Sequence, residues 1–426
     1  MWLNAHMNMN RRVFLSRLGA LAVGLPLAGC ATGGGAVAVP PPDSGAVPQP
    51  EPTQQQQQQQ PPTISGVALL AAAGDTTLGY NLEAHFDEKL ALGVSRESLF
   101  PLYMANVRPI LEWADVAMVN LECPFTERGE PLPKNFNFRA RPELVEILKA
   151  GKVDAVTLAN NHLKDYGDEG VLDTVATLDG AQIAHFGAGA NLSEARRPLI
   201  LERQGVRLGF LGYYFQADPD MIEPEAVYAT AESPGVAGCY KDLECMERMV
   251  SEDVASLVPH VDAVIPYFHW GKEGSSWVRD YQVRLAHRCV ELGARAVLGA
   301  HPHRLQGVEV YRGAPIFYSL GNFVFGGNKD PKDKLSAIVR LRIPRVGPVE
   351  ADLVPVQITR WPEAAFQPFV LDGPDREAAL ARIATLSRGF SVTLPQLAQA
   401  MPPPDLAAPV DPGPWPAVPD SVLTPH

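Results

Sequence analysis

Residues 67–77 read VALLAAAGDTT, an apolar run that ends in the polar cluster Gly74-Asp75-Thr76-Thr77. The same order, a short apolar run, then polar residues, then an amphipathic stretch, recurs along the chain from Gly66 onward. Apolar strands that alternate with helices are typical of a layered α/β fold in which the strands are buried. The predicted strands are 67–73, 116–121, 153–159, 208–213, 263–268, 296–298 and 316–318.

Helical spacing occurs between these runs, in residues 143–150, 170–178 and 276–292. In the last segment, apolar residues from Val278 to Leu292 share one helical face. The later apolar runs, 336–343 and 353–361, have no helix between them, so we expect antiparallel additions to the sheet.

Polar clusters that carry oxygen or imidazole donors follow several predicted strands. They are Gly74-Asp75-Thr76-Thr77, Asn120-Leu121-Glu122, Asn160-Asn161-His162, His269-Trp270-Gly271 and Gly299-Ala300-His301-Pro302-His303. A single Asp or His after a strand is more often a turn or structural residue. Ligands of open α/β sheets, however, bind outside the carboxyl ends of the strands, where these clusters would meet. Together they form a donor set suited to borderline divalent metals, so the sequence predicts a shared metal site.

The same clusters, followed by Tyr318-Ser319-Leu320-Gly321-Asn322-Phe323, resemble the motifs of the CapA family in one collinear order over about residues 66–330. CapA-like proteins belong to poly-γ-glutamate capsule synthesis. The resemblance implies a calcineurin-like metallophosphoesterase fold, with β-sheets flanked by helices. It also implies one or two divalent ions, of Mn, Zn, Fe or Mg.

The resemblance further implies a role for each donor. The metal ligands would be Asp75 and His303 at a first site, Asn161, His269 and His301 at a second site, and Glu122 as the bridge between them. His162 would be a catalytic general acid or a donor to the developing anion, with Asp165 beside it as an acceptor that orients His or as a solvated acid.

Substrate contacts are predicted for Asn322, Lys134 and Arg139. The two basic residues could hold a γ-glutamyl carboxylate, or they could be ordinary surface residues. Asn322 could face the site or serve in a turn.

Two positions depart from the phosphoesterase pattern: Thr77 stands where that pattern has His, and Glu122 stands where it usually has Asp. The near-complete ligand set favours a metal-dependent hydrolase. The missing His favours a non-enzymatic, polymer-binding accessory subunit of a membrane poly-γ-glutamate synthase. A periplasmic metallophosphodiesterase unrelated to capsule is a third reading that the sequence does not separate from the others.

Residues 1–30 are predicted to be a lipoprotein signal peptide. Arg11 and Arg12 precede an apolar run, 18–27, that is too short to span a bilayer. The run ends in Leu-Ala-Gly-Cys at Cys30, which resembles the lipobox in which the Cys carries lipid, and the paired arginines resemble the twin-arginine export signal. We therefore expect an exported lipoprotein of the cell envelope, in the outer membrane or periplasm of a Gram-negative source, with the membrane as a partner through Cys30.

The remaining boundaries follow from composition. Residues 31–63, rich in Pro and with Gln at 54–60, are expected to be a disordered linker, residues 64–392 a CapA-like domain, and residues 393–426 a Pro-rich tail. The formal net charge of −12 argues against nucleic-acid binding. The resemblance to the CapA family implies an anionic polymer or a phosphoester as the substrate. Among the five cysteines, Cys239 and Cys245 could pair in an oxidising compartment, but their helix-like neighbourhood favours the unpaired form.

Overall fold

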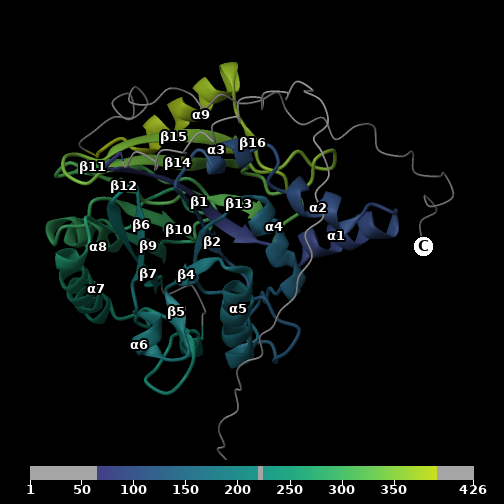
Figure 1. Ribbon diagram of the computed structural model, residues 1–426, viewed down its shortest axis with the longest axis horizontal. Coiled ribbons are helices and arrows are strands. Elements are labelled where there is room, and N and C mark those ends of the chain that lie inside the picture. Colours follow the sequence, from purple (N-terminus) through teal and green to yellow (C-terminus); the bar gives the residue numbers. More distant parts are fainter. Residues whose placement is uncertain (1–64, 219–223, 391–426) are drawn as a thin grey trace, which may run out of the picture. The chain divides into compact units, whose positions relative to one another are not determined.

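The computed structural model describes residues 65–218 and 224–390, all of which belong to the unit Pro62–His426. Two β-sheets lie face to face in this part of the chain, with helices against their outer faces (Figure 1). The predicted layered α/β class is therefore confirmed. The predicted signal peptide, linker and C-terminal tail lie outside the described residues.

The first sheet is built around strand β1, and its described strands run in the order β16-β15-β14-β1-β2-β3-β4. Strands β1 to β4 are mutually parallel, whereas β14 and β15 are antiparallel additions, as the sequence predicts. Strand β13 pairs with the last part of β1. The bounds are β1 Val67–Thr77, β2 Val116–Leu121, β3 Ala155–Thr157, β4 Ala184–Phe186, β13 Asn322–Phe325, β14 Leu335–Pro344, β15 Glu350–Gln357 and β16 Phe369–Val370.

The second sheet has the described strand order β11-β12-β10-β9-β7-β6, with β7, β9, β10 and β12 parallel to one another. Strands β5 and β8 form a small separate pair. The bounds are β5 Ala188–Gly189, β6 Leu199–Arg203, β7 Val206–Phe215, β8 Gly235–Val236, β9 Ala263–Trp270, β10 Val297–Ala300, β11 Val308–Tyr311 and β12 Ala314–Phe317.

Alternation along β1 explains why the sheets stack. Leu70 and Ala72 pack into a buried layer that also contains Phe210 of β7 and Ile265 of β9, so this face meets the second sheet. Ala71, between them, points the other way into the cluster shared with the helices of the first sheet. Because successive strand residues face opposite sides, a strand without polar residues is buried on both faces.

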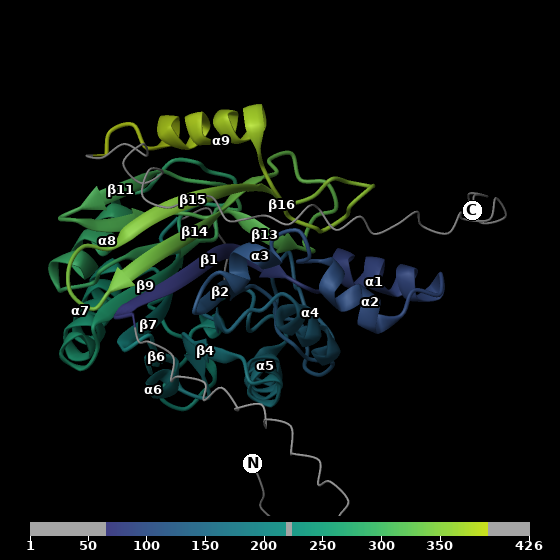
Figure 2. The same cartoon turned by 45° about the horizontal axis from the view of Figure 1, so that its top comes forward.

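The helices lie mainly outside this sandwich. Helices α1 to α5 contribute to the cluster on the first sheet, and α7 and α8 to the cluster on the second. Helix α9 contacts β11 and β15 and runs along the sheet edge in Figure 2. The bounds are α1 Asn81–Ala91, α2 Arg96–Leu102, α3 Arg108–Glu112, α4 Val145–Ala150, α5 Gly167–Ala181, α6 Leu192–Ala195, α7 Leu243–Leu257, α8 Asp280–Glu291 and α9 Gly373–Leu386, with short 3₁₀ turns at η1 Pro142–Leu144, η2 Glu225–Val227 and η3 Val258–His260. Among the described residues, no helix combines the length and apolarity needed to cross a membrane.

Several predicted boundaries shift. Strand β1 continues through Asp75 to Thr77, because its end pairs with β13 as well as β2. Helix α8 begins at Asp280 rather than at residue 276, because Gln282 and Gln306 hold the backbone of Arg279 and Trp277 in a loop.

The expectation that Cys239 and Cys245 stay unpaired is wrong. The structure joins them in a disulfide, with their Cα atoms 6.0 Å apart. Only Cys245 lies in α7, which begins at Leu243, so the loop before the helix brings Cys239 back to its partner.

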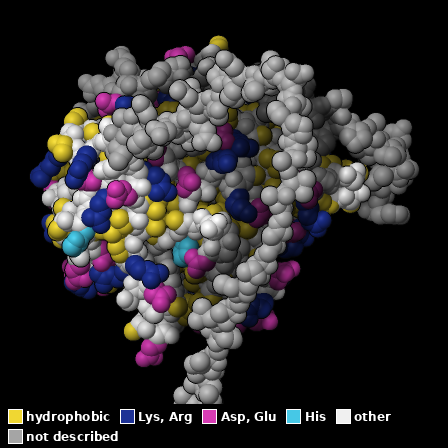
Figure 3. All heavy atoms as spheres, in the orientation of Figure 1, with side chains coloured by type: hydrophobic (Ala, Val, Ile, Leu, Met, Phe, Trp, Pro, Cys, Tyr) yellow, Lys and Arg dark blue, Asp and Glu magenta, His cyan; other side chains and the backbone are white. Residues whose placement is uncertain are grey.

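The described surface carries both signs of charge. In Figure 3, Lys and Arg side chains are interspersed with Asp and Glu over the face that is visible. Because of this mixture and the net charge of −12, that face has no general basic surface that could bind the phosphate backbone of a nucleic acid.

Candidate metal centre

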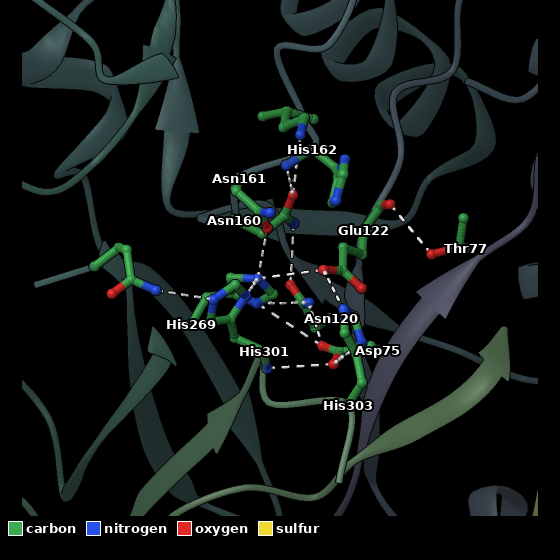
Figure 4. A network of polar contacts seen from close by, with 12 residues as sticks. Asp75, Thr77, Asn120, Glu122, Asn160, Asn161, His162, His269, His301 and His303 are labelled. Atoms are coloured by element: carbon green, nitrogen blue, oxygen red, sulfur yellow. Dashed lines mark hydrogen bonds and ion pairs between the residues drawn. The ribbon is translucent and has the colours of Figure 1, made fainter. Parts of the chain in front are cut away.

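The candidate site forms where carboxyl ends of strands from both sheets meet (Figure 4). Asp75 lies on β1 and His269 on β9, whereas Glu122, Asn161 and His301 follow β2, β3 and β10. The parallel direction of these strands places their polar ends at one edge, which is the position predicted from the sequence.

The structure brings together two groups of metal-binding side chains. The first donor group contains Asp75, Glu122 and His303, and the second donor group contains Glu122, His269 and His301. In each group, one ligand atom from every residue lies within 4.8 Å of the others. Glu122 belongs to both groups.

The Glu122 carboxylate is fully buried, and neither of its oxygens accepts a hydrogen bond from a described residue. The imidazole nitrogens Nε2 of His269 and His303 lie 3.3 and 3.8 Å from Oε1. Burial, and then the neighbouring Asp75 carboxylate, raise the pKa of Glu122 well above its ordinary value. A buried carboxylate without a hydrogen bond, beside a second carboxylate and imidazole nitrogens, is a donor set that fits a divalent metal.

The histidines differ in their electrostatics. Burial lowers the pKa of both His269 and His301 well below the ordinary value, and the proximity of other histidines lowers it further. Both imidazoles are therefore neutral, which is the form that binds metal. Burial also opposes charge on His303, but Glu122 and Asp75 outweigh it and raise the pKa of His303 to about 10.

Hydrogen bonds hold the second donor group in place. His269 Nε2 lies 2.8 Å from Asn161 Oδ1 and 2.9 Å from His301 Nδ1. Asn120 Nδ2 donates to Asp75 Oδ1 at 2.8 Å and lies 3.1 Å from His269 Nδ1. The buried side-chain amides of Asn120 and Asn161 thus orient Asp75 and His269.

Three residues that support the site, Asn120, Asn160 and Gln216, were given no role from the sequence. Asn120 and Asn160 hydrogen-bond each other at 3.1 Å, and they stand within the polar clusters already noted. Gln216, just past β7, lies with its Nε2 3.3 Å from Nε2 of His301. Its strand ends in aromatic residues, so no sequence signal marks it.

The first donor group is supported differently. Asn322 is buried, and its Oδ1 lies 2.8 Å from His303 Nδ1, so it orients that imidazole. Thr77 Oγ1 donates to the backbone carbonyl oxygen of Glu122 at 3.2 Å. His301 and His303 have φ of 98° and 54°, a left-handed backbone that residues with a Cβ rarely adopt and that tends to persist at functional sites.

The turn after β3 places His162 and Asp165 together. His162 Nδ1 lies 2.7 Å from Asp165 Oδ2, and the His162 ring packs at 4.5 Å on the ring of Phe138. Lys134 Nζ lies 2.7 Å from Asp165 Oδ1 with the side chain only 3% exposed. Arg139 is exposed and stacks over the ring of Tyr166 at 4.4 Å. The predicted substrate contacts of Lys134, Arg139 and Asn322 remain predictions.

Comparison with known proteins adds the following. Residues 69–327 match the family model described as "Bacterial capsule synthesis protein PGA_cap". The chain is 33% identical over 258 residues to "Capsule biosynthesis protein CapA" of Bacillus anthracis, covering 59% of this chain and 60% of that protein. It is 31% identical to "PGA biosynthesis protein CapA" of Bacillus subtilis (strain 168), over 67% of this chain and 70% of that protein. It is 32% identical to "Probable polyglutamine synthesis accessory protein Rv0574c" of Mycobacterium tuberculosis, over 57% of this chain and 65% of that protein.

Proposed function

Because the chain belongs to the CapA family of bacterial capsule synthesis proteins, we propose that it takes part in poly-γ-glutamate capsule biosynthesis as a metal-dependent hydrolase. The family has a metallophosphoesterase-like fold, and the two stacked sheets agree with it. The proposed substrate is a phosphoester, or a γ-glutamyl amide within an anionic polymer.

One observation carries the proposal: Glu122 stands in both donor groups with neither carboxylate oxygen hydrogen-bonded to a described residue. A buried carboxylate in a purely structural role would have hydrogen-bond donors around it. At a metal centre the same arrangement is expected, because the ion supplies the missing partner.

Each residue of the site then has a proposed task. Asp75 and His303 would hold one ion, Asn161, His269 and His301 a second, and Glu122 both. A divalent metal there supplies Lewis-acid stabilisation of charge on a phosphoryl or carbonyl oxygen. To act as the acid, His162 would carry protons on both ring nitrogens and transfer the Nε2 proton to the leaving group, while Asp165 keeps the Nδ1 proton in place.

The test is elemental analysis of the purified full chain, with hydrolysis of bis(p-nitrophenyl) phosphate and of a γ-glutamyl amide as activity probes. We expect bound divalent metal in the wild type, its loss in Glu122→Gln, and hydrolysis of one probe that follows the metal content. A wild type that binds no divalent metal after dialysis against Mn²⁺ or Zn²⁺ would exclude the proposal.

A non-enzymatic accessory role is the second candidate, and Thr77 favours it. Thr77 stands where the phosphoesterase pattern has His, so the first donor group has one strong ligand fewer than that pattern. The Thr77 hydroxyl donates to the Glu122 carbonyl. In this case, capsule output in cells should tolerate His162→Ala but not Glu122→Ala. A hydrolase should lose output with either change.

We further propose that the chain is a lipoprotein attached to the cell envelope through Cys30. The support is the sequence motif alone, since Cys30 lies outside the described residues. Cys30→Ser should abolish labelling by an alkyne fatty acid and release the protein from the membrane fraction. Membrane association that survives unchanged would contradict this attachment.

A further inference from the structure

Lys134 lies in the long connection between β2 and η1, which crosses the turn that carries Asn161, His162 and Asp165. Its Nζ is 2.7 Å from Asp165 Oδ1, 2.7 Å from the carbonyl oxygen of Asn161 and 3.4 Å from His162 Nδ1. The side chain is 3% exposed, so the ammonium points into the protein, toward Asp165 and His162.

The Asp165 carboxylate is the hub of this arrangement. It is completely buried, and its Oδ2 faces both His162 Nδ1 at 2.7 Å and the backbone N–H of Phe138 at 2.6 Å. Its other oxygen, Oδ1, faces Lys134. The ion pair with Lys134 on one oxygen and the Phe138 N–H on the other favour the orientation that presents Oδ2 to the imidazole.

This orientation selects one form of the His162 ring. A carboxylate oxygen only accepts hydrogen bonds, and its 2.7 Å contact with Nδ1 is much shorter than the 3.4 Å contact of Lys134 Nζ, so Nδ1 carries the proton. The lone pair of a neutral ring is then on Nε2, the nitrogen not engaged by Asp165. A backbone hydrogen bond also joins the segments that carry Lys134 and Asp165, because Leu132 N–H donates to the Asp165 carbonyl at 2.8 Å.

We infer that Lys134 is a positioning residue that acts through Asp165 to fix the orientation and tautomer of His162, rather than a residue that contacts substrate. The catalytic part of this inference rests on the proposed hydrolase function. The structural part, one ring form of His162, does not.

The test compares Lys134→Met with a matched control, Lys149→Met. Lys149 is an exposed lysine that pairs with Glu146 at 2.7 Å. Long-range ¹H–¹⁵N spectra of the full chain report the tautomer of each ring, and the His162 signals are identified by their loss in His162→Gln. We expect a single Nδ1–H form in the wild type and in Lys149→Met, and a mixture of tautomers in Lys134→Met. An unchanged single form in Lys134→Met overturns the inference.

Kinetics with bis(p-nitrophenyl) phosphate separate positioning from substrate binding. A positioning role predicts that Lys134→Met lowers kcat by about 10-fold or more with KM within about twofold of the wild type. A raised KM with unchanged kcat would assign Lys134 to substrate instead. If the wild type hydrolyses neither this phosphodiester nor a γ-glutamyl amide, the hydrolase proposal fails, whereas the spectra still decide the role of Lys134.

Lys134→Met could unfold the protein, since it leaves the buried Asp165 without its cation. The double variant Lys134→Met/Asp165→Asn removes both charges and keeps the volumes. Because Lys134 acts through Asp165, this double variant should match Asp165→Asn in its His162 spectrum and kcat. A further drop in kcat, or a further change in the spectrum, beyond Asp165→Asn would overturn the inference.

Discussion

At the scale of single residues, Glu122 and His301 are the side chains whose loss should remove metal. Glu122 lies in both donor groups and His301 in one. We expect Glu122→Ala and His301→Ala each to weaken metal binding at least about 10-fold, and hydrolysis to fall with it. Inductively coupled plasma mass spectrometry after equilibrium dialysis gives the metal content.

Glu127→Ala is the matched control, because Glu127 is an exposed acid a few residues further along the same connection. It should keep its metal. Full metal content in both Glu122→Ala and His301→Ala would refute the assignment of the centre.

His162 should behave differently from these ligands. Its Nδ1 is engaged by Asp165, and it belongs to neither donor group. His162→Ala should therefore keep the bound metal while turnover falls by roughly 10²-fold or more, which is the usual contribution of a general acid. Steady-state rates and metal analysis on the same preparation check this. Loss of metal and turnover together would make His162 a ligand.

At the residue scale, the polar clusters at strand ends were visible in the sequence. Asp75, Glu122, His269 and His301 meet because parallel strands end at one edge of each sheet. The inward direction of Lys134 could not be predicted, because it depends on how a long connection folds over a turn distant in sequence.

At the scale of elements, His85 on α1 should make stability depend on pH. The half-buried ring lies with Nδ1 3.0 Å from the Tyr103 hydroxyl. Burial lowers the pKa of His85 to about 4 from 6.5, with Lys89 lowering it further and Glu88 opposing. The unfolded chain therefore binds more protons between pH 6.5 and 4, so the free energy of unfolding should decline as pH falls through that window.

We expect His85 to account for about 1–2 kcal/mol of this decline, which is less than full linkage because the ring is partly exposed. His85→Gln keeps a polar side chain that does not titrate and is the matched variant. Urea unfolding at pH 7 and pH 4.5 measures the difference between the two proteins. An equal loss of stability in both would show that His85 contributes nothing to it.

The elements themselves were predicted unevenly. Strands β2, β7 and β9 were found because they are long and continuously apolar. Strand β13 and helix α9 were not, because β13 follows directly on the Gly321 turn and is set by its pairing with β1, and because α9 lacks a strong apolar face. Short elements gain their stability from tertiary packing more than from their own pattern.

At the scale of the whole molecule, residues 31–63 should be dispensable for folding. They contain no periodic apolar pattern and precede the first described strand. Deleting them should leave the melting temperature of the protein unchanged within about 1 °C, since a loss of 1 kcal/mol in a domain of this size shifts Tm by roughly 2–4 °C. Circular dichroism of the two proteins measures this, and a drop of several degrees would show that the segment packs.

The layered α/β class, the family and the strand-end position of the candidate site could be read from local patterns. Apolar runs predict which strands are buried, and the order of the motifs along the chain indicates the family. Only the tertiary structure decided that the two sheets face each other, that Cys239 pairs with Cys245 and that Lys134 turns inward. These outcomes depend on contacts between segments far apart in sequence, and no local pattern encodes the directions in which those side chains meet.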